Sequence, residues 1–176
     1  MMNYAMFLRG VNVGRIYIKM ADLRTALATL PVSNVKTLLA SGNVVCTAES
    51  SAAELKSMVE TLLRESFGYE AWVVVVDESE LAAIIDACPY PADDATHHAY
   101  VTLSAEPAIL DELARHAGGI PSTELARLAP IALAWRAAAG GTLENPFSKL
   151  SARPRYKSTT TTRNVRTLLK CRDAMP

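Results

Sequence analysis

The chain has 176 residues with 18 basic and 18 acidic side chains, so its formal net charge at pH 7 is zero. This balance weighs against a protein built mainly to neutralise nucleic-acid phosphates, although it allows a local basic patch. Hydrophobic residues make up 50% and charged residues 20% of the chain, a composition that is typical of one or two packed domains and excludes disorder.

We expect neither a membrane-spanning segment nor a signal peptide in this sequence. No apolar run approaches the roughly 20 residues that cross a bilayer, so we expect no membrane partner. The N-terminus lacks a basic region followed by an apolar core, which is not the pattern of a signal peptide. Cys46, Cys88 and Cys171 are odd in number and far apart, and they favour a reducing, cytoplasmic location over a disulfide framework.

The first half of the chain predicts the order strand–helix–strand–strand–helix–strand. The predicted strands are 4–9, 35–40, 44–47 and 71–76, and the helices are 20–30 and 52–67. Ser51 and Glu54 form a capping-box pattern before the second helix, and Gly68 follows its end. A further helix follows, with Asp77 as its expected cap and with an apolar stripe formed by Leu81, Ile84, Ile85 and Cys88.

The second half of the chain repeats this order, which predicts an α+β fold of two βαββαβ units with antiparallel sheets, each unit followed by an extra helix. The expected domains are 1–90 and 97–176. The predicted strands are 99–103, 124–128, 131–135 and 156–160, and the helices are 107–117, 147–152 and 163–173. Thr161 or Thr162 is the expected cap of the last helix.

This topology predicts where a site lies. Because the first crossover of a βαββαβ unit is right-handed, the end of the first strand, the start of the first helix and the following hairpin turn share one end of the sheet. Cations, amide or hydroxyl groups and the positive end of the helix then make an anion pocket. The candidate ligand-binding residues are Arg9, Gly10, Asn12, Gly14, Lys19, Ser41, Gly42 and Asn43.

Two simpler interpretations compete with this pocket. In the first, Gly10 and Gly14 are present only because the loop needs residues with positive φ. In the second, Ser41-Gly42-Asn43 is only a favourable hairpin turn. A second candidate lies near the C-terminus, where Thr162, Arg163 and Asn164 stand between a strand and a helix and can bind an anion. Its alternative is a threonine cap beside a solvated arginine.

The sequence gives little support for a metal site, for acid–base or cysteine catalysis, or for RNA binding. His97 and His98 point to opposite faces of a strand, and His116 has no partner at matched spacing, so no metal site is expected. No pair of carboxylates is placed for acid–base work, and Cys46 is expected to be buried without a base. The sheet lacks the aromatic side chains on its central strands that stack RNA bases, which makes nucleic acid an unfavoured partner.

Three segments resemble the domain-of-unknown-function 1697 family: Leu8–Gly14, Lys19–Arg24 and Ala40–Val45. Ser148–Leu150 and Thr161–Val165 resemble later motifs of that family. Arg15 stands where the family often has glycine, and Val165 where it usually has tryptophan. The resemblance implies two ferredoxin-like, RNA-recognition-like units that either keep or exchange edge strands, and it implies no activity.

We therefore expect a cytoplasmic protein that binds a small anionic or phosphorylated ligand. The alternative is a non-catalytic interaction or oligomerisation module in which the same motifs only shape the fold. The sequence identifies no catalytic residue and no cofactor, and it leaves open whether the chain is an enzyme or forms a homo-oligomer.

Overall fold

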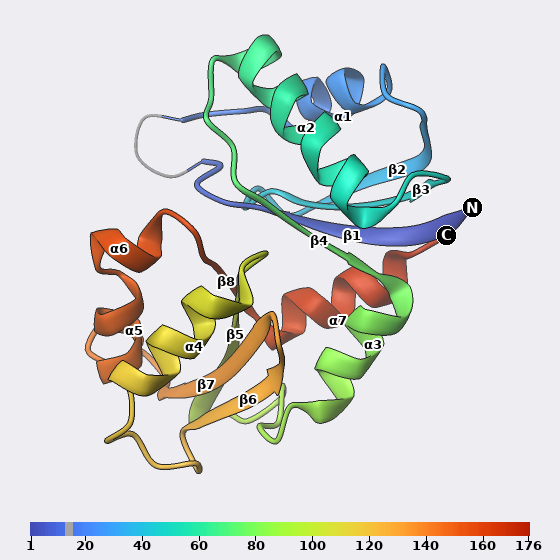
Figure 1. The fold of residues 1–176 in the computed structure, drawn as a ribbon. Helices are drawn as coiled ribbons and strands as arrows, with labels where there is room; N and C mark the ends of the chain where they lie inside the picture. The colour runs from blue at the N-terminus through green and yellow to red at the C-terminus, as the bar shows by residue number, and fades with distance from the viewer. Residues whose placement is uncertain (13–15) are drawn as a thin grey trace. The chain divides into compact units, whose positions relative to one another are not determined.

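The computed structural model describes residues 1–12 and 16–176 (Figure 1). Backbone contacts divide the chain into two compact units. The first unit comprises residues 1–82 together with 169–176, and the second comprises 83–168. The expected domains 1–90 and 97–176 remain a prediction.

The first unit contains a four-stranded antiparallel sheet with the order β2-β3-β1-β4. Its elements are β1 (Met2–Leu8), α1 (Met20–Leu27), β2 (Val32–Leu38), β3 (Asn43–Ala48), α2 (Ala52–Phe67) and β4 (Val73–Asp77). Because β3 pairs antiparallel with both β1 and β2, those two strands run parallel on either side of it, as predicted.

Helices α1 and α2 cover one face of this sheet (Figure 1). The face is apolar, and Met6, Leu8 and Val44 are fully buried on it. Leu55 and Val59 of α2 pack into the same core. Burying each such side chain contributes about 1.5–3 kcal/mol, which is why the alternating pattern of the strands fixes which face the helices cover.

The predicted caps of α2 are confirmed. The Ser51 side chain accepts from the backbone N–H of Glu54, and the Glu54 carboxylate accepts from the backbone N–H of Ser51 at 2.8 Å. Gly68 ends the helix with a left-handed φ of 60°. These reciprocal bonds satisfy N–H groups that the first helical turn leaves without partners.

The second unit repeats the arrangement, with the sheet order β6-β7-β5-β8. Its elements are β5 (His97–Leu103), α4 (Pro107–His116), β6 (Leu125–Ala129), β7 (Ala132–Ala138), α5 (Pro146–Ser151), α6 (Pro154–Lys157) and β8 (Thr161–Asn164). Trp135 is central to the core, where it stacks on Tyr100 with ring centroids 4.6 Å apart and lies 5.6 Å from the ring of Phe147.

The trailing helices are α3 (Glu78–Ala87) and α7 (Val165–Ala174), and each contains a boundary between the units. All strands in each sheet come from the same half of the chain, so no edge strand is exchanged within the described ranges. The predicted α+β fold of two βαββαβ units is therefore confirmed.

Two predictions near the C-terminus are wrong. Residues 156–160 do not form a strand: Pro154 begins the short helix α6, and Tyr156 is buried within it. The strand starts five residues later, at Thr161, so both proposed threonine caps lie inside β8. The Asn164 side chain takes the capping role instead, because its Oδ1 accepts the Arg166 N–H at 2.8 Å.

Candidate functional site

The loop after β1 meets the turn between β2 and β3, as the topology predicted. The backbone N–H of Leu8 donates to the carbonyl of Gly42 at 2.8 Å. Asn12 crosses from the loop to the turn and donates its side-chain amide to the carbonyl of Ala40 at 2.6 Å. We call this junction the loop–turn site, and its residues are Arg9, Gly10, Asn12, Lys19, Ser41, Gly42 and Asn43.

Asn12 holds both segments of the site. Its Nδ2 donates to the carbonyls of Ala40 and Ile18, and its Oδ1 accepts the Ile18 N–H at 2.9 Å. Its φ of 57° is left-handed, a conformation that asparagine tolerates better than most residues. Both amide hydrogens thus have acceptors within the protein, which makes Asn12 a residue that shapes the loop.

Asn43 performs the same task from the turn. It is fully buried and donates to the carbonyl of Leu38 at 2.9 Å and to the Ser41 hydroxyl at 3.0 Å. A buried amide of this kind must be paired to avoid a desolvation penalty of about 1–3 kcal/mol. The turn is therefore held by a side chain as well as by the strand ladder.

Gly42 allows the two segments to approach closely. It has a φ of +79°, and a Cβ built there would lie 3.0 Å from the Cβ of Leu8 and 3.1 Å from that of Val11. Gly10, in the facing loop, also has positive φ, at +73°. The glycines thus meet a backbone requirement here, which is compatible with either interpretation of the site.

The site contains two cationic side chains, Arg9 and Lys19. Arg9 is half-buried and Lys19 is exposed. Across the described ranges neither side chain forms an ion pair or a hydrogen bond. Lys19 precedes α1 without a side-chain cap, and Asp22 places one carboxylate in the first turn of that helix. Gly14, the remaining candidate of this loop, lies outside the described residues.

The second candidate motif belongs to the second unit. Thr162 shares a hydrogen bond with Thr102 across the β5–β8 pair at 2.8 Å. Arg163 is only 8% exposed and donates to the Thr161 hydroxyl at 2.6 Å and to the carbonyl of Thr162 at 2.9 Å. The solvated arginine of the simpler interpretation is therefore not observed, since this guanidinium is buried.

The structure also bears on a cysteine nucleophile, a metal site and a membrane-spanning helix. Burial raises the pKa of Cys46 to about 11, which disfavours the thiolate that a nucleophile needs. In the residues that the structure describes, no three His, Cys, Asp or Glu side chains are grouped to hold a metal ion. No helix found there is long and apolar enough to span a bilayer.

One group that the sequence analysis set aside does have a partner. His116 contacts the hydroxyl of Tyr156 through Nδ1, and Tyr156 donates to Glu112. Glu112 and His116 stand four residues apart on α4, and this spacing was the only signal in the sequence. Tyr156 lies 40 residues further along the chain and was assigned to a strand, so the contact was missed.

The two four-stranded sheets and their crossover helices define a protein with two ferredoxin-like units in tandem. The family model described as "Protein of unknown function (DUF1697)" matches residues 1–126, so the chain belongs to this family. The solved structure of the conserved bacterial protein SP0830 from Streptococcus pneumoniae is similar over 98% of both chains, with a TM-score of 0.80. The two chains are 21% identical, a likeness that shows the fold alone. No curated protein matches the chain.

Proposed function

We propose that the first unit binds a small anionic or phosphorylated molecule at the loop–turn site. The supporting observation is that Arg9 and Lys19 flank a tightly held junction and, within the described ranges, have no anionic partner of their own. A phosphate between them gains charge-assisted hydrogen bonds, which are roughly twice as strong as neutral ones.

The geometry changes the role expected of the asparagines. The side-chain amides of Asn12 and Asn43 donate hydrogen bonds to carbonyl and hydroxyl groups of the loop and the turn. In our proposal they keep the binding segments in place, while Arg9, Lys19 and the first N–H groups of α1 contact the ligand. The dipole of α1 adds positive potential there, which Asp22 reduces in part.

A ligand screen tests this proposal. Thermal unfolding is measured with inorganic phosphate and with a panel of nucleotides and phosphate esters. A ligand present at a hundred times its Kd adds about 2.7 kcal/mol of stability. Arg9→Ala and Lys19→Ala each remove the response in our proposal. Lys170→Ala, which changes an exposed lysine of the same unit outside the site, retains it.

The alternative is a non-catalytic interaction or oligomerisation module. In that case no compound in the panel raises the unfolding temperature, and Arg9→Ala changes the mass measured by light scattering. A ligand response that is unaltered in both Arg9→Ala and Lys19→Ala also contradicts the proposal.

We infer that the second motif, Thr162, Arg163 and Asn164, also contacts an anion. Its place directly before α7 supports this, because the first backbone N–H groups of a helix attract an anion. Asn164→Asp tests it, because aspartate keeps an oxygen that caps α7 while its negative charge repels an anion, so weaker phosphate binding is expected. The cytoplasmic location is likewise a proposal, and it rests on the number and spacing of the cysteines.

A further inference from the structure

A chain of four side chains connects α4 to α6 in the second unit. The Nε and Nη2 groups of Arg155 donate to the two oxygens of the Glu112 carboxylate. The hydroxyl of Tyr156 donates to the same carboxylate at 3.0 Å, and it also contacts Nδ1 of His116. Tyr156 is only 1% exposed, so its hydroxyl has little access to water. The set forms a continuous Arg–Glu–Tyr–His relay.

The charge on Glu112 determines the direction of these hydrogen bonds. The Arg155 guanidinium lowers the pKa of Glu112 to about 2, so this carboxylate is ionised at neutral pH and can only accept. Tyr156 has one hydroxyl hydrogen and gives it to Glu112. Its oxygen must then accept from His116, which in the neutral imidazole places the hydrogen on Nδ1 and leaves Nε2 as an acceptor.

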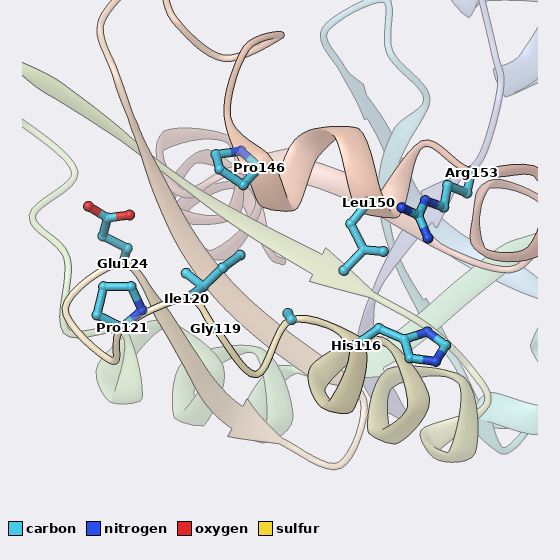
Figure 2. Close-up of a pocket in the computed structure, with 9 residues that line it drawn as sticks. His116, Gly119, Ile120, Pro121, Glu124, Pro146, Leu150 and Arg153 are labelled. Atoms are coloured by element: carbon cyan, nitrogen blue, oxygen red, sulfur yellow. The ribbon is translucent and has the colours of Figure 1, made fainter.

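His116 also lines a cleft, whereas the other three side chains of the relay do not (Figure 2). The cleft has a volume of about 430 Å³. Ligand clefts span roughly 300–1,000 Å³, so a molecule of several hundred daltons or less fits this space. The second unit thus has a concave site with a histidine ring that is held in one orientation.

The two ends of the cleft carry opposite charges. In Figure 2, Arg153 and His116 lie toward one end and Glu124 lies at the other, with the side chains of Ile120 and Leu150 between them. Arg153 and Glu124 are exposed, and neither side chain forms an ion pair or a hydrogen bond in the part of the chain that the structure describes.

We propose that this cleft binds a short peptide with a free amino group and a free carboxylate, and that an apolar dipeptide is the smallest form that fills it. Arg153 holds the carboxylate, and Nε2 of His116 accepts the peptide N–H that lies next to that carboxylate. Glu124 holds the ammonium group. The apolar side chains of the peptide contact Ile120 and Leu150.

Three arguments favour a peptide over a simple anion. A simple anion uses Arg153 but leaves the Glu124 carboxylate facing it at the other end. An acceptor at Nε2 of His116 also disfavours an anion alone, because it has no hydrogen to donate. A peptide offers a cation, an anion and a donor N–H in a fixed order, and this order matches the arrangement along the cleft.

The first experiment is an NMR titration of the full, ¹⁵N-labelled chain with Leu-Leu, N-acetyl-Leu-Leu and Leu-Leu amide, followed by a panel of other apolar dipeptides. We expect saturable shifts at the amides of Gly119 and Ile120. Each blocked form is expected to bind about tenfold more weakly, because it loses one charge-assisted contact. Absence of saturable shifts with every dipeptide overturns the proposal, as does equal binding of the blocked and free forms.

Two variants assign the ends of the peptide. Arg153→Gln is expected to bind Leu-Leu and its amide equally, while it still discriminates against the acetylated form. Glu124→Gln is expected to show the reverse preference. Both side chains are exposed, so these variants retain the fold, and Arg115→Gln is a matched control on α4 that leaves binding unchanged. Unaltered discrimination in both variants contradicts the proposal.

Discussion

A single side-chain nitrogen, Nδ2 of Asn12, lies 2.6 Å from the carbonyl of Ala40 and 3.2 Å from that of Ile18. One amide thus joins three segments: the loop after β1, the residues before α1 and the β2–β3 turn. Because Arg9 and Lys19 lie on two of these segments, the spacing of the two cations depends on this residue. Internal hydrogen bonds therefore organise the loop–turn site.

The first prediction concerns this organising role. Asn12→Ala is expected to lower the free energy of unfolding by about 1–3 kcal/mol, since two carbonyls and one N–H lose their partner. Asn12→Gly is expected to cost less, because glycine adopts the left-handed φ without strain. Urea denaturation of the three proteins measures the difference. Equal stability of Asn12→Ala and the wild-type protein would show that water replaces all three bonds.

The second prediction compares two glycines with nearly identical backbone conformations. Gly42 has φ +79° and close neighbours, whereas Gly140 has φ +78° and no atom within 4 Å of a built Cβ. Gly140→Ala is expected to cost about 1–2 kcal/mol from the left-handed conformation alone. Gly42→Ala adds overpacking against Leu8 and Val11, which costs about 1–3 kcal/mol more. Denaturant unfolding followed by amide signals of each unit tests this, and equal costs would contradict the close approach.

The convergence of the loop and the turn was predictable because it follows from strand order and crossover handedness alone. Neither rule needs a side-chain contact. The sequence could not predict that the side-chain amides of Asn12 and Asn43 donate within the protein, since asparagine can bind a ligand or hold a loop equally well. The sequence pattern predicted where the loop and the turn meet. Only the hydrogen bonds to the carbonyls of Ala40 and Leu38 show that the two asparagines hold the loop and the turn.

The error near the C-terminus has a local cause. Residues 156–160 carry β-branched threonines, which favour a strand, but Pro154 stands at the first position of a helix, where its ring is well accommodated. Tyr156 is then buried against α4 through its contact with Glu112. A long-range contact outweighed the local propensity and moved the strand to Thr161.

The third prediction is a pH dependence that arises at Glu112. Arg155 lowers its pKa from an ordinary 4.5 to about 2 in the folded protein. A depressed pKa means that the unfolded chain takes up this proton first on acidification. The stabilisation is therefore complete above about pH 4.5 and is lost as the pH falls toward 2.

Glu112→Gln isolates this contribution. The difference in unfolding temperature between the wild-type protein and this variant is expected to be largest near pH 6 and to shrink steadily below pH 4.5. Arg155→Gln keeps the carboxylate but removes the guanidinium, so the folded pKa of Glu112 is expected to return toward its ordinary value and most of this pH-dependent contribution to disappear. A difference between wild type and Glu112→Gln that stays constant from pH 6 to pH 2 would contradict the Arg155–Glu112 pair.

The fourth prediction is the tautomer of His116. Since Tyr156 gives its only hydroxyl hydrogen to the ionised Glu112, the neutral imidazole of His116 must carry its hydrogen on Nδ1. Ring ¹⁵N shifts report this directly, because a protonated and an unprotonated nitrogen resonate far apart. His98 forms no side-chain hydrogen bond in the described residues and serves as the internal reference.

Tyr156→Phe removes the oxygen that selects this tautomer and retains most of the buried ring volume. The Nδ1–H form of His116 is expected to lose its preference in this variant, while His98 keeps its wild-type shifts. Unfolding temperature measured on the same sample separates this electronic effect from loss of packing. Should His116 keep the same tautomer without the hydroxyl, another group would orient the ring, and the cleft would lose the fixed acceptor on which the binding of a peptide N–H depends.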